Sequence, residues 1–319
     1  MDNITHTLAG ALIGQMGLKR RSRFAMAACI LGANAPDIDV FAPLVLPVDG
    51  IAFHRGPLHA VFAWPVLAAG IVAILWMVDQ LKARGEDTLQ FRPGALFIVA
   101  LLAVLTHPFL DWLTTYAIAI FAPVDWRWYS GNAIFIVDWV YWLLMIAGIA
   151  LSARRWRRHL PKATRPARVA GAMMLAYIGF NLAESAWVER ATAAELRSRG
   201  IVPALVVAGP PPLAFWSRTI EWRSSDSFGG GWFSPAGGLR LDPATQPLGL
   251  NDPQLALAER TQRYVRSFLV WSRMPIVVRI EGQSFLTDQR FYSAATSPLS
   301  SSMRRAVRRS SFLIPLDNR

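Results

Sequence analysis

Long apolar runs alternate with short polar segments along the first 188 residues. As helices, runs of about 20 residues span roughly 30 Å, which is the thickness of the hydrocarbon core of a bilayer. Two shorter apolar segments, Ile4–Leu18 and Phe24–Asn34, come first and suggest a tilted or re-entrant pair. The pattern predicts a mainly α-helical, polytopic membrane domain over residues 1–188, with full spans at 58–78, 94–113, 133–151 and about 168–188.

The pattern changes at about residue 189, where long apolar runs stop. Residues Pro253–Ser272 carry apolar positions at helical spacing and predict one amphipathic helix. A small α+β extramembrane domain is therefore expected over residues 189–319. Its predicted strands are Val202–Val207, Pro275–Ile280 and Ser311–Ile314, and its predicted turns are Gly209–Pro212, Gly229–Gly231 and Ser297–Ser302.

Composition agrees with an integral membrane protein. Hydrophobic residues make up 53% of the 319 residues and charged residues only 17%, against roughly 25% charged in soluble domains. The mean hydropathy is +0.31. Cys29 is the single cysteine, which excludes a disulfide framework and a cysteine-based zinc site. The sequence also lacks a P-loop and the GxSxG and GxGxxG motifs.

The net charge of +12 follows membrane topology. The segment Arg154–Arg168 carries seven basic residues and no acidic one, which places it in the cytoplasm under the positive-inside rule. Residues 189–319 then lie outside the cytoplasmic membrane, which we expect to be a bacterial inner membrane. Their net charge of +7 suits an anionic lipid surface. Because topology explains the basic clusters, no nucleic-acid partner is expected.

The same topology places four of the five histidines at one membrane level, on the outer side. They are His6, His54, His59 and His107, whereas His159 lies in the basic inner loop. Carboxylates accompany them. His107 and Asp111 are four residues apart and share one helix face. Imidazole and carboxylate together suit zinc or a similar divalent ion, although each motif alone also fits an ordinary hydrogen bond or helix cap.

Other polar residues at this level are candidates for further roles. Asp37 and Asp39 follow Pro36, which ends the preceding helix. Arg127, together with Arg55, could hold an anionic group such as phosphate, or could be an interfacial arginine between belt tryptophans. Asp138 could be a further ligand or could orient a ligand histidine.

Five motifs in order resemble the YdjM-type membrane-bound metal-dependent hydrolases. They are MDNITHTLAGALIG, GANAPDIDVF, HRGPLHA, LTHPFLDWLTTYA and the FIVDW that follows RWYSGN. The order of THT, PD, His and HxxxD is also similar to zinc-dependent phospholipase C, a helical family with a multinuclear zinc site. The resemblance implies the metal ligands His6, Asp37, His54 or His59, His107 and Asp111.

The sequence predicts a membrane-bound hydrolase that binds one or more divalent ions, which we expect to be zinc. The ion would activate water against an ester, above all a phosphoester of a lipid or lipid-linked substrate. Asp39 or Asp138 would act as general base and Arg127 would bind the substrate. The rival interpretation is non-catalytic: a structural metal clip or ion site with an external binding domain.

Overall fold

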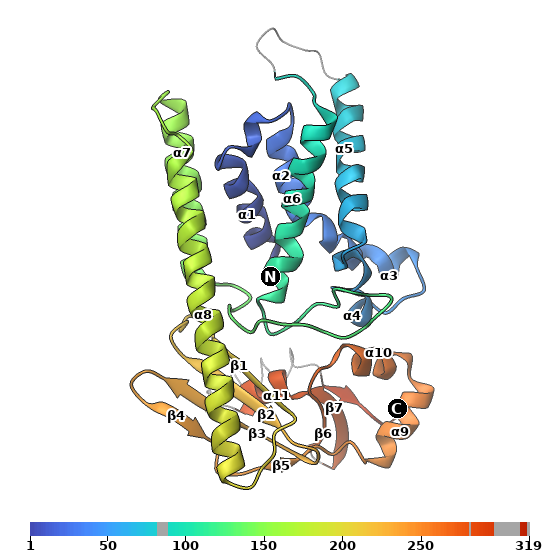
Figure 1. Ribbon diagram of the computed structural model, residues 1–319. Helices are drawn as coiled ribbons and strands as arrows, with labels where there is room; N and C mark the ends of the chain where they lie inside the picture. The colour runs from blue at the N-terminus through green and yellow to red at the C-terminus, as the bar shows by residue number, and fades with distance from the viewer. Residues whose placement is uncertain (82–88, 281, 297–312, 318–319) are drawn as a thin grey trace. The chain divides into compact units, whose positions relative to one another are not determined.

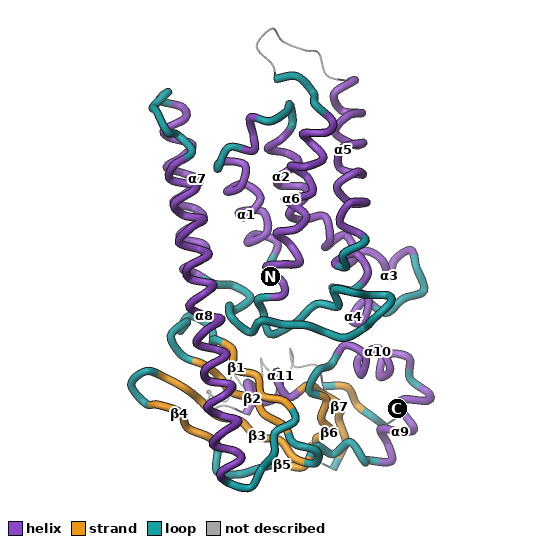
Figure 2. Tube along the Cα trace, in the orientation of Figure 1, coloured by secondary structure: helices purple, strands orange, loops and turns teal. Residues whose placement is uncertain are grey.

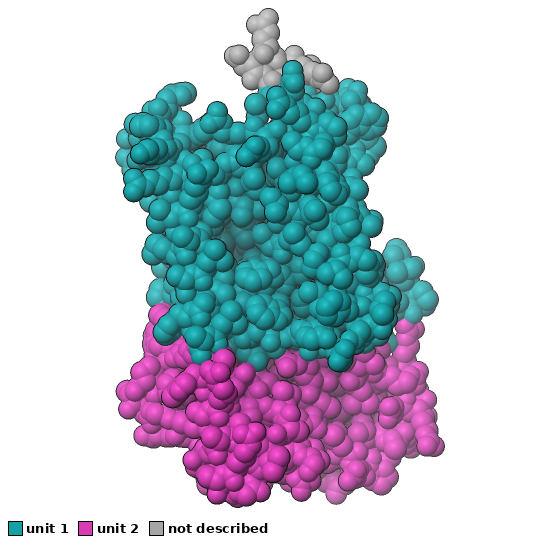
Figure 3. Space-filling model, viewed as in Figure 1, with its two compact units in different colours: residues 1–183 teal, residues 184–319 magenta. Residues whose placement is uncertain are grey.

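The computed structural model describes residues 1–319 except 82–88, 281, 297–312 and 318–319. The chain divides into two compact units, Met1–Ala183 and Glu184–Arg319 (Figure 3). The first unit is built from helices and loops, and the second contains the strands (Figure 2). This is the predicted order of a helical membrane part followed by an α+β part.

The first unit is a bundle of helices of unequal length (Figure 1). Short 3-10 turns and one-turn helices lie between the long helices. The long helices are α1 (Asn3–Gln15), α2 (Ala25–Asn34), α5 (Ala63–Leu81), α6 (Pro93–Trp112), α7 (Trp139–Arg157) and α8 (Arg165–Ser198), the last of which runs on into the second unit. The short ones are η1 (Leu18–Arg20), η2 (Ala35–Phe41), α3 (Ala42–Val45), α4 (Gly50–Phe53) and η3 (Pro57–His59).

Among the described residues, four helical segments are long and apolar enough to cross a membrane: Ala25–Val45, Ala63–Leu81, Pro93–Trp112 and Arg165–Ser198. The first of these joins α2, η2 and α3, so the predicted short segment Phe24–Asn34 continues further than expected. The span predicted at 58–78 starts only at Ala63, because Pro57–His59 form a 3-10 turn. The span predicted at 133–151 starts at Trp139, where Asp138 caps α7, and its last turn carries three arginines.

Small residues let α1, α2 and α6 approach closely. An added Cβ on Gly32 of α2 would lie 2.7 Å from the Ala103 Cβ and 2.9 Å from the Ala100 carbonyl oxygen of α6. On the other face of α2, an added Cβ on Gly10 of α1 would lie 2.4 Å from the carbonyl oxygen of Cys29, which belongs to α2. Such contacts between backbones are how helices pack in membranes. They hold the C-terminal end of α2 against the middle of α6, one turn before His107.

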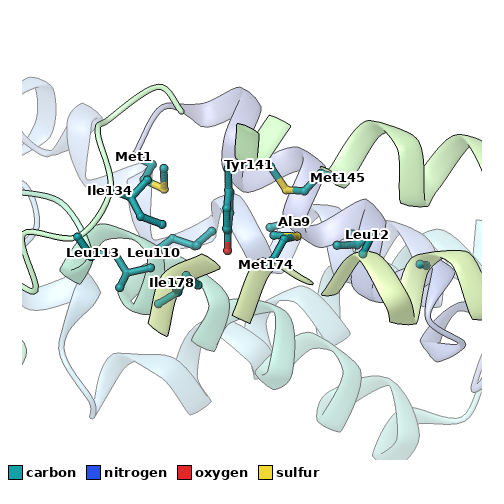
Figure 4. Packing of buried hydrophobic residues seen from close by; sticks show 13 residues of the cluster. Met1, Ala9, Leu12, Leu110, Leu113, Ile134, Tyr141, Met145, Met174 and Ile178 are labelled. Carbon is teal, nitrogen blue, oxygen red and sulfur yellow. The ribbon is translucent and has the colours of Figure 1, made fainter. Parts of the chain in front are cut away.

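A second contact region joins α1, α7 and α8 around Tyr141. The Tyr141 ring lies between Leu110 and Ile134 on one side and Ala9 and Met174 on the other (Figure 4). Both Tyr141 and Met145 of α7 are buried. This packing gives α7 a buried face, although α7 is not among the candidate membrane spans of the described residues.

The second unit contains two antiparallel sheets. In the larger sheet the strand order is β1 (Leu205–Gly209), β2 (Arg218–Arg223), β3 (Ser227–Ser234) and β4 (Gly238–Leu241), with β5 (Gln246–Pro247) also paired to β3. Val188 and Leu196 of α8 pack on Ile220 and Trp222 of this sheet. The smaller sheet is β6 (Pro275–Ile280), β7 (Gln283–Asp288) and β8 (Ile314–Pro315). The remaining helices are α9 (Pro253–Thr261), α10 (Arg263–Trp271) and α11 (Gln289–Thr296).

Several predictions for this unit are corrected by the structure. The predicted helix Pro253–Ser272 is two helices, because Gln262 has an extended backbone with φ −109° and ψ 113°. The predicted turn Gly229–Gly231 lies inside β3, where a Cβ on Gly229 would lie 2.6 Å from the Trp222 ring.

The predicted strands fare differently. Strand Pro275–Ile280 is confirmed, and the strand predicted at Val202–Val207 starts three residues later, at Leu205. Of the strand predicted at Ser311–Ile314, the first two residues lie outside the described residues, as does the turn Ser297–Ser302.

Candidate metal centre

The structure brings four histidines and three aspartates together at one end of the helices of the first unit. They come from five separate segments: the first turns of α1, the η2 turn after α2, the end of α4, η3, and the last turns of α6. Five of the seven side chains are fully or almost fully buried, and those of Asp37 and His54 are partly exposed. The residues are His6, Asp37, Asp39, His54, His59, His107 and Asp111.

Four of these residues turn one atom each toward a common point. The Nε2 atoms of His59 and His107 are 3.1 Å apart. Asp37 Oδ1 lies 3.6 Å from the first and 3.2 Å from the second, and Asp111 Oδ2 lies 3.3 Å and 3.5 Å from them. A tetrahedral zinc ion with ligands at about 2.0–2.1 Å would have ligand–ligand edges of about 3.3–3.4 Å. The observed separations therefore match a tetrahedral divalent ion, and we call these residues the four-ligand set.

Hydrogen bonds around the four-ligand set fix the histidine orientations. His107 Nδ1 lies 2.7 Å from the carbonyl oxygen of Ala33, one of the α2 carbonyls without a partner inside the helix. Because that oxygen can only accept, His107 carries its proton on Nδ1 and leaves Nε2 as a bare acceptor. His59 Nδ1 lies 3.2 Å from Asp39 Oδ2 without forming an aligned hydrogen bond, and the negative charge there favours a proton on Nδ1. Support of this kind behind a ligand histidine is characteristic of metal sites.

Asp39 connects the four-ligand set to its more exposed edge. Its Oδ1 accepts a hydrogen bond from His54 Nδ1 at 2.7 Å, and its Oδ2 accepts one from the Arg55 backbone N–H at 3.1 Å. Asp37, Asp39 and His54 form a second group whose ligand atoms lie within 4.8 Å of one another. The His54 side chain is 35% exposed, whereas that of Asp39 is fully buried. His54 is therefore the most exposed member of the cluster.

His6 lies beside the four-ligand set rather than in it. Its ring stacks on His107 with centroids 3.6 Å apart, and its Nε2 lies 3.5 Å from Asp111 Oδ1. The same oxygen forms an ion pair with the Met1 amino group. His6 is fully buried, yet neither ring nitrogen has a hydrogen-bond partner among the described residues. Buried imidazoles are rarely left in this state unless a ligand or water completes them.

Arg55 is a functional candidate that the sequence suggested only as a helper of Arg127. Its guanidinium is buried, with one nitrogen 3.3 Å from Asp111 Oδ1 and another donating to Thr114 Oγ1 at 3.3 Å. Its backbone is in the left-handed region, with φ 63°, and its carbonyl accepts from Ala119 N–H. Burial lowers the pKa of Arg55 to about 10, so it stays charged at neutral pH.

Two of the predicted catalytic residues have other structural partners. Asp138 caps α7: it accepts from the Tyr141 N–H and from the Tyr177 hydroxyl, both at 2.8 Å. Arg127 has a largely exposed side chain and pairs with Asp125 at 2.7 Å. The structure thus gives Asp138 a helix-capping role, and it buries Arg55, not Arg127, beside Asp111.

Comparisons with known proteins agree that the helical part belongs to a membrane protein. The sequence profile of the YdjM inner membrane protein family matches residues 1–188, which include all of the clustered residues. The chain is also similar to the uncharacterized protein YfhP of Bacillus subtilis (strain 168), with 28% identity over 166 residues. That match covers 47% of this chain and 46% of YfhP, so the chain spans about half the length of the curated relative it matches. No solved structure matches the chain. Because the family profile covers more than half of its length, the chain belongs to the YdjM inner membrane protein family.

Proposed function

We propose that the protein is a membrane-bound, metal-dependent hydrolase that cleaves a phosphoester of a lipid or lipid-linked substrate. The single observation that carries the proposal is the convergence of the four-ligand set. The two bare imidazole nitrogens lie 3.1 Å apart, and each of them lies 3.2–3.6 Å from the two carboxylate oxygens. Arg55 and the Met1 amino group contact Asp111 Oδ1 and leave Oδ2 facing the two imidazole nitrogens, so a cation among the four facing atoms would satisfy them.

The chemistry of the donors favours a divalent ion of the zinc type. Imidazole nitrogens with carboxylates suit zinc, and the separations match its tetrahedral geometry. When bound, such an ion supplies Lewis acidity, lowers the pKa of water and stabilises charge that develops on a phosphoryl oxygen. In this assignment Asp37, His59, His107 and Asp111 hold the ion, and Asp39 orients His59 and His54.

Other residues of the cluster are placed to handle the substrate and the proton. Arg55 holds a buried positive charge within reach of Asp111, where it can bind an anionic phosphoryl oxygen. His6 Nε2 has no hydrogen-bond partner among the described residues and can accept a proton from water. Hydrolysis then adds water to phosphorus and releases the alcohol, whose oxygen takes up a proton.

The position of the cluster supports a lipid substrate at the outer membrane face. The cluster lies at the C-terminal ends of α2 and α6, whereas basic residues gather at the opposite helix ends, after α1 and around Arg154–Arg168. By the positive-inside rule the basic ends are cytoplasmic, and the cluster and the second unit are then extracytoplasmic. A headgroup phosphate at that interface would reach the cluster from the His54 side.

A second candidate function, a structural metal clip, is favoured by one observation. Four protein ligands would complete a tetrahedral zinc site, as in structural sites, whereas catalytic zinc usually has three protein ligands and one open position. Arg55 and His6 favour the catalytic candidate, because a clip needs neither a buried guanidinium nor an imidazole without partners.

Turnover by purified protein separates the two candidates. The zinc-loaded protein is incubated in detergent with phosphodiester and phosphomonoester lipids, and the release of headgroup or phosphate is followed for wild type and for His107→Ala. A hydrolase shows turnover that His107→Ala loses. A clip shows no turnover in either protein, although removal of the metal lowers the unfolding temperature of wild type.

A further inference from the structure

Helix α8 leaves the bilayer close to Glu184. It is one continuous helix, Arg165–Ser198, and a candidate membrane span (Figure 1). At 1.5 Å per residue, the stretch from Arg168 to Trp187 is about 29 Å long, which is the thickness of the hydrocarbon core. Glu184, near the end of this stretch, is the first acidic residue of α8. The turn around Glu184–Trp187 therefore lies at the membrane–water interface.

The loop between β1 and β2, residues 210–217, is tied to α8 at this level. Arg218, which is fully buried, forms an ion pair with Glu184 at 2.7 Å and donates to Ser185 Oγ at 2.9 Å. The same guanidinium donates to the carbonyl oxygens of Phe215 and Ser217 at 2.6 Å and 2.8 Å. One arginine thus fixes the loop backbone against the part of α8 that emerges from the bilayer.

This loop presents apolar side chains to its surroundings. Leu213 is 71% exposed and Trp216 is 47% exposed, and the Phe215 and Trp216 rings pack edge to face with centroids 5.1 Å apart. Residues 210–217 (PPPLAFWS) contain no charged side chain. In water, this much uncharged apolar surface on a rigidly held loop is unfavourable.

Further exposed tryptophans lie at the same end of the larger sheet. Trp187 of α8 is 51% exposed and packs against Phe233 of β3 at 5.2 Å between ring centroids. The strand register pairs Phe233 with Arg218, and it pairs Trp232, which is 40% exposed, with Thr219. Tryptophan is the residue that most favours the interface, because its ring is apolar and its N–H is polar.

We propose that the loop 210–217, with Trp187 and Trp232, is a lipid-contacting surface that seats the second unit on the bilayer interface. The occupant is the headgroup and upper acyl region of the bilayer that α8 itself crosses. Two independent observations fix this occupant: the Arg218 contacts place the loop at the exit level of α8, and the exposed side chains have interfacial chemistry. The proposal does not depend on the metal centre.

Spin labels in the full-length protein test the proposal. Cys29, the single cysteine, is buried, so a Cys29→Ala background carries one label at an introduced cysteine. Leu213→Cys and Trp216→Cys report on the loop. Val202→Cys is the matched control: it is 74% exposed but precedes Leu205, which the register places at the opposite end of the sheet from the loop.

The protein is reconstituted into phospholipid nanodiscs, and each label is tested with oxygen, which partitions into lipid, and with a water-soluble nickel chelate. We expect labels at 213 and 216 to be several-fold more accessible to oxygen relative to nickel than the label at 202. Leu213 and Val202 are largely exposed, so labels there leave the packing intact, whereas Trp216→Cys removes the ring contact with Phe215. An equal ratio of oxygen to nickel accessibility at positions 202, 213 and 216 would place the loop in water and overturn the proposal.

Discussion

Asp39 Oδ2 lies 3.2 Å from His59 Nδ1, on the side of the ring that faces away from the four-ligand set. A carboxylate in this position fixes the tautomer and orientation of a ligand histidine, and it increases the basicity of the ligand nitrogen. The pair therefore links a buried acid outside the four-ligand set to the metal affinity of that set.

Replacement of this orienting carboxylate weakens metal binding without abolishing it. We expect Asp39→Asn to lower zinc affinity by roughly 10-fold to 100-fold, the usual loss when a residue behind a ligand is changed. Competition with a chelator of known affinity measures the effect. Asp125→Asn, at the carboxylate that pairs with Arg127, is the control and retains wild-type affinity. If Asp39→Asn binds zinc as tightly as wild type, Asp39 does not orient His59.

Variants of Arg55 and Arg127 distinguish substrate binding from a general effect of surface charge. Arg55→Lys keeps the charge but loses the planar guanidinium fork, so we expect kcat/KM for bis(4-nitrophenyl) phosphate to fall by roughly 10-fold to 100-fold. Metal content stays the same, because Arg55 is not in the four-ligand set. Arg127→Lys, on an exposed side chain, leaves the rate near that of wild type. If Arg127→Lys lowered the rate more than Arg55→Lys did, Arg127 and not Arg55 would be the anion-binding residue.

Asp138 affects stability and not metal binding. It caps α7 and accepts from Tyr177 on α8, so Asp138→Ala removes two hydrogen bonds at a buried position. We expect a loss of about 1–3 kcal/mol of unfolding free energy, seen as a lower thermal midpoint in detergent. Tyr177→Phe removes one of the two bonds and loses less. A wild-type midpoint with loss of bound zinc in Asp138→Ala would make Asp138 part of the metal site.

The buried acid Glu221 makes the second unit less stable at high pH. Burial raises the pKa of Glu221 to about 8; nearby Arg290 opposes this rise and Asp288 adds to it. The folded state therefore holds a proton that the unfolded state releases above its ordinary pKa of 4.5. Stability then falls as pH rises from about 4.5 to about 8, by an amount on the order of a few kcal/mol.

A matched neutral variant tests the sign of this effect. Glu221→Gln cannot ionise, so its unfolding midpoint relative to wild type should be higher at about pH 9 than at about pH 6. Differential scanning fluorimetry of the full-length protein gives both midpoints. A difference that is constant over this range would mean that Glu221 keeps an ordinary pKa in the folded protein.

The sequence was sufficient to find the helices and the cluster for identifiable reasons. Apolar runs as long as 94–113 have no stable alternative to a helix in a bilayer, and α6 follows that run closely. His107 and Asp111 then share a face by helix geometry alone. The other candidate ligands could be grouped because the inferred topology placed the ends of their segments on one side of the membrane. The distances between these residues could not be predicted without the fold.

Other features depend on tertiary contacts that local sequence does not encode. Gly229–Gly231 reads as a turn, yet the run pairs with β2 as a strand, and Gly229 has no side chain because the Trp222 ring occupies that space. Gln262 interrupts a continuous helical spacing of apolar residues, so periodicity alone cannot reveal the break between α9 and α10. Arg55 is buried and has a left-handed backbone, and an arginine in a local sequence pattern signals neither feature.

Metal content measures the central claim most directly. Purified wild-type protein, His107→Ala, Asp111→Ala and the control His159→Ala, whose histidine is exposed and outside the cluster, are analysed by inductively coupled plasma mass spectrometry. We predict at least one divalent ion per folded wild-type chain and per His159→Ala chain, and its loss in the two ligand variants while they remain monodisperse. A folded wild-type protein that binds no divalent ion, even after incubation with zinc, would contradict the metal-site assignment and with it the proposed hydrolase.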